Sequence, residues 1–223
     1  MNISHTKTRL LIITSVCMIL AACQQHEQKR LPILGERHAA TKEVDGKTVT
    51  DTVYQTIPAF SFINQDSVTI TDRYFNNSIY VADFFFTSCP SICPIMSKNL
   101  LKVLKKYQGN EQVKILSHSI DTKYDTPWVL KRYANKLGVT GDQWQFVHGS
   151  EAAIYGIADK YMVYAKEDSN APGGFEHQGW LILVDKDKRI RGAYDGTNTE
   201  QVNQLMADMD ILLAEYFPNK ENE

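Results

Sequence analysis

The 223-residue chain has few cysteines, no excess of basic charge and no apolar run of transmembrane length. Lys and Arg total 24 against 26 Asp and Glu, which gives a net charge of −2, so no basic stripe indicates a nucleic-acid-binding surface. Four cysteines are too few for a scaffold held together by disulfides. With 43% apolar and 22% charged residues, the composition is that of a globular protein rather than a disordered or fibrous one.

The N-terminus has the pattern of an export and anchoring signal. Lys7 and Arg9 precede an apolar stretch of about 13 residues, 10–22, shorter than the roughly 20 that a transmembrane helix needs. Leu-Ala-Ala directly before Cys23 resembles a bacterial lipobox, in which the cysteine is lipidated and becomes the mature N-terminus. We therefore expect a signal peptide at 1–22 and an exported, membrane-anchored lipoprotein, its domain in the periplasm or on the outer side of the membrane. Cleavage without lipidation is the alternative.

The remaining chain divides into a tether, one domain and a tail. Residues 23–57 are mostly polar and show no sustained period of 2 or 3.6, a pattern that predicts a flexible tether. Residues 58–217 form one domain of about 160 residues, which is large enough for a real core, and 218–223 remain as a C-terminal tail.

Strands and helices alternate within this predicted domain. A hairpin at 59–70 precedes an apolar run at 79–86, typical of a central strand covered on both faces. The pattern predicts further strands at 113–119, 145–147, 178–184 and 190–194, and helices at 94–107, 127–137, 151–160 and 202–217. This order, with a cysteine pair at the first strand-to-helix junction, predicts an α/β protein with a thioredoxin-like fold and an extra N-terminal β-hairpin.

Cys89 and Cys93 are the residues best suited to chemistry. They lie four apart at the start of a predicted helix, where the helix dipole favours a thiolate, so we expect a lowered pKa for Cys93. Two soft thiolates suit Cu(I) or zinc, with a third ligand from elsewhere in the fold. The pair is one residue wider than the Cys-x-x-Cys of thioredoxins. A structural disulfide is the alternative, because an exported protein can oxidise neighbouring cysteines.

His177 is the candidate third ligand. It ends a glycine-rich loop directly before the predicted strand at 178–184, which would let it reach over the cysteine helix. A surface histidine without a partner is the alternative. His118 and His148 end predicted strands, and we interpret both as structural or solvent-facing.

Two aspartates are candidates for supporting roles. Asp121 ends a strand at the edge where functional loops of open α/β sheets emerge, although a turn role is equally consistent, and more so for Asp125. Asp83 lies inside an apolar strand six residues before Cys89. A carboxylate there must be paired, protonated or at an edge. It could tune a nearby thiol, and a buried structural role is the alternative.

Together these residues resemble the Sco/SenC family of copper-binding, thioredoxin-like proteins. The segment Phe84–Pro94 is similar to the family signature F-x-F-T-x-C-P-x-x-C-P, and Ser119–Pro127 is similar to S-V-D-P-x-x-D-T-P. His177 stands where the family has its copper-ligand histidine. The resemblance implies that Cys89, Cys93 and His177 bind copper, as Cu(I) or Cu(II), and Asp121 is a weaker suggestion for a further Cu(II) ligand.

The resemblance also implies a function in assembling cytochrome c oxidase. It indicates a copper chaperone that supports the CuA centre of oxidase subunit II, or serves another copper or thiol client. A thiol-disulfide oxidoreductase using the same dithiol is the rival, and a lipoprotein with an inert disulfide is a third possibility. The chain departs from the family at Ser91, where an acid is common, at Thr122, where proline is usual, and at Asp83, where an aromatic is usual. None of these is an expected ligand.

Overall fold

The computed structural model describes residues 30–218, apart from the side chain of His177. The predicted signal peptide, Cys23, residues 24–29 and residues 219–223 lie outside the described residues. The strands are β1 (Arg37–Val44), β2 (Lys47–Tyr54), β3 (Ser61–Asn64), β4 (Thr69–Thr71), β5 (Ile79–Phe85), β6 (Val113–Ser119), β7 (Trp144–His148), β8 (Ala165–Glu167), β9 (Phe175–His177), β10 (Trp180–Val184) and β11 (Ile190–Asp195). The helices are α2 (Cys93–Lys106), α3 (Pro127–Leu137), α4 (Glu151–Lys160) and α5 (Thr199–Tyr216), and short 3-10 turns lie at Asp72–Phe75 and Pro172–Gly174.

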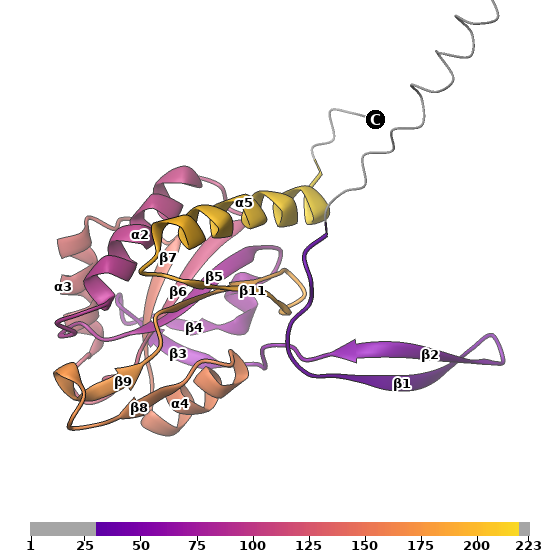
Figure 1. Cartoon of the computed structure of the whole chain (residues 1–223), viewed down its shortest axis with the longest axis horizontal. Coiled ribbons are helices and arrows are strands. Elements are labelled where there is room, and N and C mark those ends of the chain that lie inside the picture. Colours follow the sequence, from indigo (N-terminus) through magenta and orange to yellow (C-terminus); the bar gives the residue numbers. More distant parts are fainter. Residues whose placement is uncertain (1–29, 219–223) are drawn as a thin grey trace, which may run out of the picture. The chain divides into compact units, whose positions relative to one another are not determined.

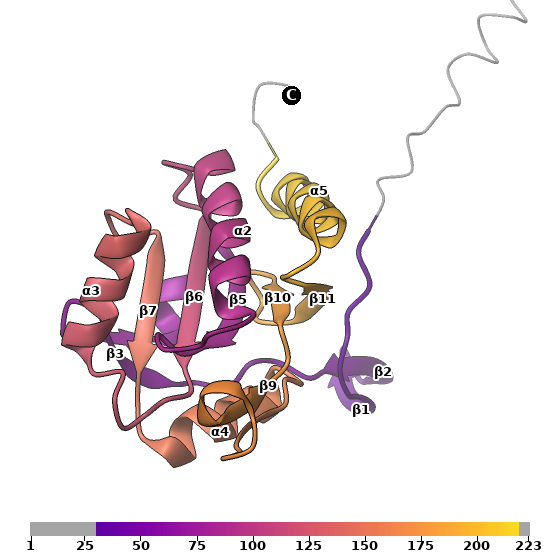
Figure 2. The same ribbon diagram turned by 60° about the vertical axis from the view of Figure 1, so that its left-hand side comes forward.

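A seven-stranded mixed sheet organises the domain, in the order β11-β10-β5-β6-β7-β3-β4. β5, β6 and β7 are mutually parallel, as expected for strands joined by helical crossovers, whereas β10 and β3 run antiparallel to their neighbours. Helices α2 and α5 lie over one face of the sheet and α4 lies over the other (Figure 1). Figure 2 shows α3 next to β7, and the Tyr133 hydroxyl of α3 lies 2.8 Å from the Ser97 hydroxyl of α2. The predicted α/β class is therefore confirmed.

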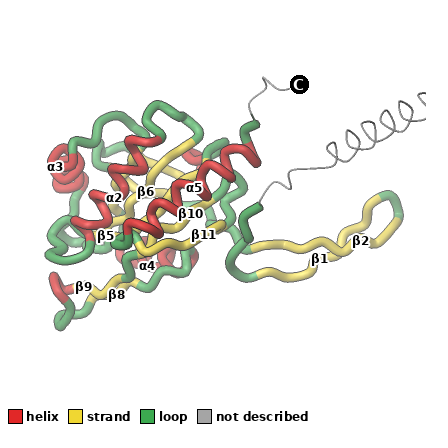
Figure 3. The backbone as a smooth tube through the Cα atoms, turned by 45° about the horizontal axis from the view of Figure 1, so that its top comes forward, coloured by secondary structure: helices red, strands yellow, loops and turns green. Residues whose placement is uncertain are grey.

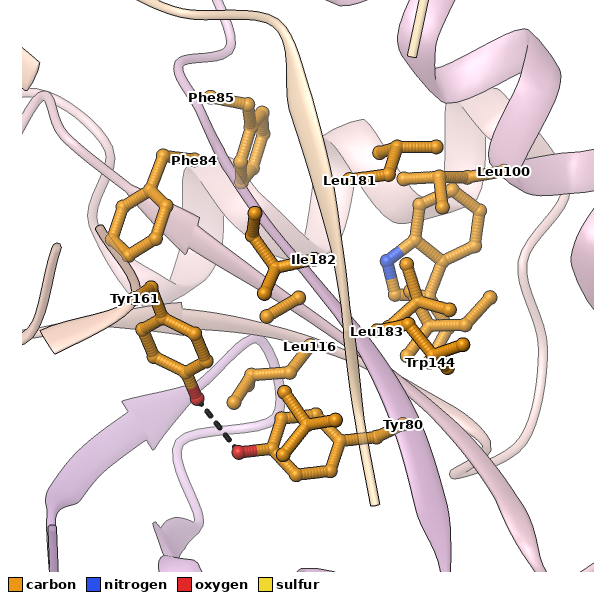
Figure 4. Packing of buried hydrophobic residues seen from close by; sticks show 14 of the residues in the cluster. Tyr80, Phe84, Phe85, Leu100, Leu116, Trp144, Tyr161, Leu181, Ile182 and Leu183 are labelled. Carbon is orange, nitrogen blue, oxygen red and sulfur yellow. Dashed lines mark hydrogen bonds between the residues drawn. The ribbon is translucent and has the colours of Figure 1, made fainter. Parts of the chain in front are cut away.

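The central strand β5 is buried along its whole length, as its continuous apolar run predicts. Its side chains alternate between two parts of the core (Figure 4). Tyr80 packs with Tyr161 on one side, and their hydroxyl oxygens are 2.9 Å apart. On the other side, the ring of Phe85 packs against that of Tyr133 of α3, with centroids 5.3 Å apart. Because both faces are covered, the residues that follow β5 begin from a rigid support.

The predicted hairpin at residues 59–70 is present as β3 and β4, which pair antiparallel from Ser61 opposite Thr71 to Ile63 opposite Thr69. The structure adds a second hairpin, β1 and β2, inside the region predicted to be a tether (Figure 3). The expectation of an irregular tether therefore does not hold for 37–54. The missed signal is Asp45-Gly46, a two-residue turn with both φ angles positive, which is the dipeptide preferred in tight hairpins.

Arg191 fixes the chain that precedes this hairpin. Its guanidinium donates to the carbonyl oxygens of Leu31 at 2.9 Å and Pro32 at 3.1 Å, and it forms ion pairs with Asp185 and Glu215 at 3.0 Å each. Leu31 joins the hydrophobic core. The domain thus includes residues well before 58. Arg191 joins residues 31–32 to Asp185, which directly follows the end of β10 that pairs with the start of β5.

Among the residues that the structure describes, no helix combines the length and the apolar character needed to cross a membrane.

Candidate metal and dithiol site

Cys89 and Cys93 lie beyond the carboxyl end of β5, where the chain turns into α2. The N–H of Cys89 donates to the carbonyl oxygen of Phe86 at 3.2 Å, and Cys93 is the first residue of α2, directly before Pro94. Both side chains are buried, with exposed fractions of 6% for Cys89 and 1% for Cys93. The structure has them as two thiols rather than a disulfide. The Ser91 hydroxyl lies 3.6 Å from the sulfur of Cys89.

The environment of Cys93 corrects the expectation of a lowered pKa. A hydrogen bond with the Cys89 thiol, followed by burial, raises the pKa of Cys93 above its ordinary value, while a backbone hydrogen bond with Phe86 lowers it. Cys93 does lie at the N-terminus of α2, but its pKa is raised because the thiol is withdrawn from water and held against a second thiol. Two closely held soft donors remain a suitable pair for Cu(I).

The segment that carries His177 lies against the cysteine loop on both sides of the histidine. Before it, Gly173 approaches so closely that an added Cβ would lie 2.7 Å from the Phe86 ring and 3.1 Å from Pro90, and the rings of Phe86 and Phe175 are 4.9 Å apart. After it, an added Cβ on Gly179 would lie 3.4 Å from Ile92 and 3.6 Å from the Met96 sulfur. Residues on both sides of His177 in the sequence therefore contact the loop and the helix that carry the dithiol.

His177 ends a short strand that the sequence pattern did not predict. β9 pairs antiparallel with β8, and the backbone of His177 lies opposite that of Ala165. The side chain of His177 lies outside the described residues. Among the side chains that are described, no three His, Cys, Asp or Glu form a metal-binding group. The described residues thus bring two thiols together at the start of α2, and the ligand role expected of His177 stays a prediction.

Asp125 holds the start of the cysteine loop. Its carboxylate accepts hydrogen bonds from the Thr87 N–H at 2.9 Å, from the Thr87 hydroxyl at 2.5 Å and from the Ser119 hydroxyl at 2.6 Å. These bonds tie the residue two positions before Cys89 to the end of the neighbouring strand β6. The sequence pattern favoured a turn role for Asp125 and missed this one. The available signal was that Thr87 and Asp125 both belong to the segments that resemble the family signatures, Phe84–Pro94 and Ser119–Pro127.

We expect Asp125→Ala to destabilise the protein by about 1–3 kcal/mol, because the N–H and hydroxyl donors at this partly buried site lose their acceptor. Urea unfolding monitored by circular dichroism measures the change. Glu111→Ala, which removes an exposed carboxylate, is the matched control and should change stability by less than about 0.5 kcal/mol. Equal stability of the two variants would show that the Asp125 hydrogen bonds do not hold the loop.

Asp121 is placed as a turn residue. It is buried, and its Oδ1 accepts the N–H groups of Lys123 at 3.3 Å and Tyr124 at 3.1 Å, while its own N–H donates to the Ser119 hydroxyl at 3.2 Å. These bonds shape the loop between β6 and α3. The turn interpretation thus has direct support from these contacts, whereas a ligand role for Asp121 has none.

Asp83 lies buried within the sheet, beneath the helices that cover β5. The Ser117 hydroxyl donates to its Oδ1 at 2.5 Å, and the Trp144 indole N–H donates to the same hydroxyl at 2.8 Å. Burial raises the pKa of Asp83 to about 7, and the bond from Ser117 opposes the rise. The negative charge of Asp83 also contributes to the raised pKa of Cys93. Asp83 is thus hydrogen-bonded to Ser117, and its charge acts on the Cys93 thiol.

His118 lies among aromatic rings on the α4 side of the sheet. Its ring stacks on Phe84 with centroids 4.7 Å apart and contacts Phe62 and Tyr161. Burial lowers the pKa of His118 to about 3, so the imidazole is neutral at physiological pH. His148 is half-buried at the end of β7. Neither belongs to a metal-binding group among the described side chains.

The sheet order, the helical crossovers and a dithiol at the first helix start define a thioredoxin-like α/β protein with a Cys-x3-Cys pair. The sequence model of the SCO1/SenC family matches residues 49–213. The chain belongs to this family.

Comparison with individual proteins agrees with this assignment. The chain is 28% identical over 166 residues to the SCO1 protein homolog of Bacillus subtilis, covering 74% of this chain and 86% of that protein. It is 27% identical over 143 residues to a Stutzerimonas stutzeri protein named for copper binding, covering 61% of this chain and 67% of the other.

Solved structures of the family share the fold. A SCO1/SenC family lipoprotein from Bacillus anthracis matches with a TM-score of 0.65 and 25% identity, covering 71% of this chain and 95% of that one. BsSco, a member of the Sco family of cytochrome c oxidase assembly proteins in which a disulfide switch was identified, matches with a TM-score of 0.61 and 28% identity. That match covers 70% of this chain and 92% of BsSco. The predicted thioredoxin-like fold is confirmed.

Proposed function

We propose that this protein binds copper through Cys89, Cys93 and His177. It would deliver the copper to the CuA centre of cytochrome c oxidase subunit II, or serve another copper or thiol client. The carrying observation is that two buried thiols at the start of α2 face a segment that contacts their loop on both sides of His177. Two thiolates and one imidazole suit Cu(I). Copper would be the cargo, an exchangeable ion that passes from these ligands to those of a client.

A lipid on Cys23 completes the proposed function. It would anchor the exported protein to a membrane, with the domain in the periplasm or on the outer side. The lipoprotein name of the Bacillus anthracis relative supports this anchor. With Leu31 fixed by Arg191, the span from Cys23 to the ordered domain is short, about 3.3–3.6 Å per residue when fully extended. An anchored domain would therefore stay close to the membrane and its client.

Thiol–disulfide exchange is the second candidate function, favoured by the unequal exposure of the two thiols. Cys89 is 6% exposed and Cys93 is 1% exposed. A thiolate at Cys89 would attack one sulfur of a client disulfide and release the other as a thiolate. Cys93 would then displace the client from the mixed disulfide, so that the client gains two electrons and the protein becomes a Cys89–Cys93 disulfide. The disulfide switch of the relative BsSco supports this alternative.

Replacing His177 separates the two functions. We expect His177→Ala to weaken Cu(I) binding by at least about 100-fold, or about 2.7 kcal/mol, because one of three ligands is lost. Anaerobic titration against a competing Cu(I) chelator measures the affinity. His38→Ala, which removes an exposed histidine of β1, is the control and should bind like wild type. Unchanged affinity in His177→Ala, together with intact disulfide exchange, would favour the oxidoreductase.

A further inference from the structure

We infer that the solvent-facing side of helices α2 and α3, here called the α2–α3 face, is the docking surface for an acidic protein client. This inference rests on the proposed function, because it concerns the client that meets the dithiol. The face adjoins the dithiol, since Cys93 is the first residue of α2. Helices α2 and α3 are also joined directly, by a 2.8 Å contact between the hydroxyls of Ser97 and Tyr133.

The charges of the α2–α3 face are all of one sign. Helices α2 and α3 contain seven Lys or Arg residues and no Asp or Glu, although the whole chain has a net charge of −2. Lys106 and Lys131 pair with acids of neighbouring elements. The other five make no ion pair among the described residues and are exposed: Lys98, Lys102, Lys105, Arg132 and Lys136. Such a one-signed surface attracts a partner of the opposite charge.

Exposed apolar and aromatic side chains lie at the dithiol end of the same face. Ile95 in the first turn of α2 is 48% exposed, Trp128 in the first turn of α3 is 65% exposed, and Tyr124 just before α3 is 75% exposed. The Arg132 guanidinium lies 4.7 Å from the centre of the Trp128 ring. Trp, Tyr and Arg are the residues that most often dominate protein–protein binding energy. The face therefore combines anchors for a protein with long-range positive charge.

The topology places these anchors where a client must approach. Parallel strands β5 and β6 end at the same edge of the sheet, so the helices that follow them, α2 and α3, both begin beside the cysteine loop. A client that exchanges copper or electrons with Cys89 has to bring its own ligands to this edge, and it then contacts the first turns of both helices. The client is therefore expected to carry acidic side chains around its ligand cysteines.

The opposite side of the dithiol has a different character, which would orient the client. A groove of about 330 Å³ lies there, lined in part by Ile92, Gly179 and Trp180. Its acidic lining residue is Asp195, and on the neighbouring β8–β9 pair the exposed Glu176 lies opposite the exposed Lys166. This side therefore carries charges of both signs, whereas helices α2 and α3 carry only positive ones, and an acidic client surface is attracted to the α2–α3 face. The charge pattern thus selects one docking orientation.

The test compares two labelled peptides that share one pair of cysteines and differ only in their flanks, which are glutamates in one and lysines in the other. Fluorescence anisotropy with the reduced, copper-free protein measures both affinities. We expect the acidic peptide to bind at least ten-fold more tightly at about 20 mM salt, and the preference to vanish near about 500 mM salt, where screening is strong. Equal binding of both peptides at low salt would overturn the inference.

Charge reversal locates the surface. The variant Lys98→Glu, Lys102→Glu and Arg132→Glu should reverse the preference of the protein, so that the basic peptide binds more tightly. A matched control reverses three exposed charges on other elements, Arg73, Lys47 and Lys160, and therefore has the same net charge. This control should retain the preference for the acidic peptide. If both variants lose the preference equally, net charge rather than the α2–α3 face is responsible, and the inference fails.

An aromatic truncation tests the anchors. Trp128→Ala should weaken binding of the acidic peptide about five-fold at both salt concentrations, because its contribution is not electrostatic. Val68→Ala, which trims another exposed apolar side chain, 54% exposed in the turn between β3 and β4, should leave binding unchanged. Equal affinity of these two variants and wild type would contradict an anchor role for Trp128.

Two further measurements separate this inference from its alternatives. Sedimentation with phosphatidylcholine vesicles containing about 30% phosphatidylglycerol probes a lipid surface. If wild type binds the vesicles, the triple charge-reversal variant does not, and wild type binds both peptides equally, then the α2–α3 face binds a membrane and not an acidic client. That result would overturn the inference. Copper titration of the same preparations tests the proposed function. Preference for the acidic peptide without copper binding would support the docking surface and refute the chaperone, whereas copper binding without that preference would do the reverse.

Discussion

Cys93→Ser is expected to lower Cu(I) affinity by at least about 1,000-fold, which corresponds to about 4 kcal/mol. The serine hydroxyl is a hard, neutral donor, whereas Cu(I) prefers soft thiolates. Cys93 is also the more deeply buried of the two thiols, with 1% exposed, so water cannot readily replace its sulfur. Competition with a Cu(I) chelator under anaerobic conditions, at a pH held constant, measures the loss.

Ser88→Ala is the matched control for this loss, because it changes an exposed residue of the same loop next to Cys89. Its copper affinity should equal that of wild type. Far-ultraviolet circular dichroism of Cys93→Ser should match wild type, so that reduced affinity reports the ligand and not unfolding. A Cys93→Ser protein that still bound one copper with wild-type affinity would remove Cys93 from the ligand set.

The second large effect concerns the pH dependence of stability at Asp83. Burial raises the pKa of this carboxyl from 3.8 to about 7 in the folded protein. The folded state therefore holds a proton that the unfolded state releases between about pH 4 and 7. The stability that Asp83 contributes is fully present below about pH 4 and is lost as the pH rises through 7. The unfolding free energy falls over this window by an amount on the order of 4 kcal/mol.

Asp83→Asn should remove this dependence, because the amide stays neutral and its oxygen can still accept the Ser117 hydroxyl hydrogen bond. At pH 8 the variant is expected to be more stable than wild type by a few kcal/mol, whereas at pH 4 the two should be similar. Urea unfolding at both pH values tests this. Asp142→Asn changes an exposed carboxylate and should leave the pH dependence intact. Equal pH profiles for wild type and Asp83→Asn would mean that Asp83 does not titrate in this window.

Elements with a strong hydrophobic period were predictable from the sequence. The apolar run at 79–86 became β5 (Ile79–Phe85), and helix α4 has the predicted bounds, Glu151–Lys160. Pro127 and Gly138 framed α3 as expected, with Gly138 in the left-handed conformation that ends a helix. In each of these segments the local pattern and the tertiary burial favour the same structure, so no long-range information was needed.

What escaped prediction depends on contacts between distant segments. The β8–β9 pair joins three residues on each side of a loop, too few to leave a periodic signal. The contact of Gly173 with Phe86 and Pro90 links positions more than 80 apart in the sequence. The pKa of Cys93 was predicted in the wrong direction, because the helix dipole is visible in the sequence whereas burial against Cys89 is not.

The candidate site divides in the same way. Cys89 and Cys93 follow from motif and spacing, and the structure brings them together. His177 is proposed from its position between a glycine-rich loop and a strand and from the family resemblance, and its assignment as a ligand stays a prediction. Asp125 and Thr87 both lie in recognisable motif segments of the sequence. Only the fold shows that the Thr87 N–H donates a hydrogen bond to the Asp125 carboxylate.

Copper K-edge X-ray absorption of the Cu(I)-loaded protein tests the central claim most directly. We predict one copper per chain with two sulfur ligands and one nitrogen ligand, and loss of the nitrogen in His177→Ala. A first shell without sulfur, or a shell that is identical in wild type and His177→Ala, would contradict a site formed by Cys89, Cys93 and His177.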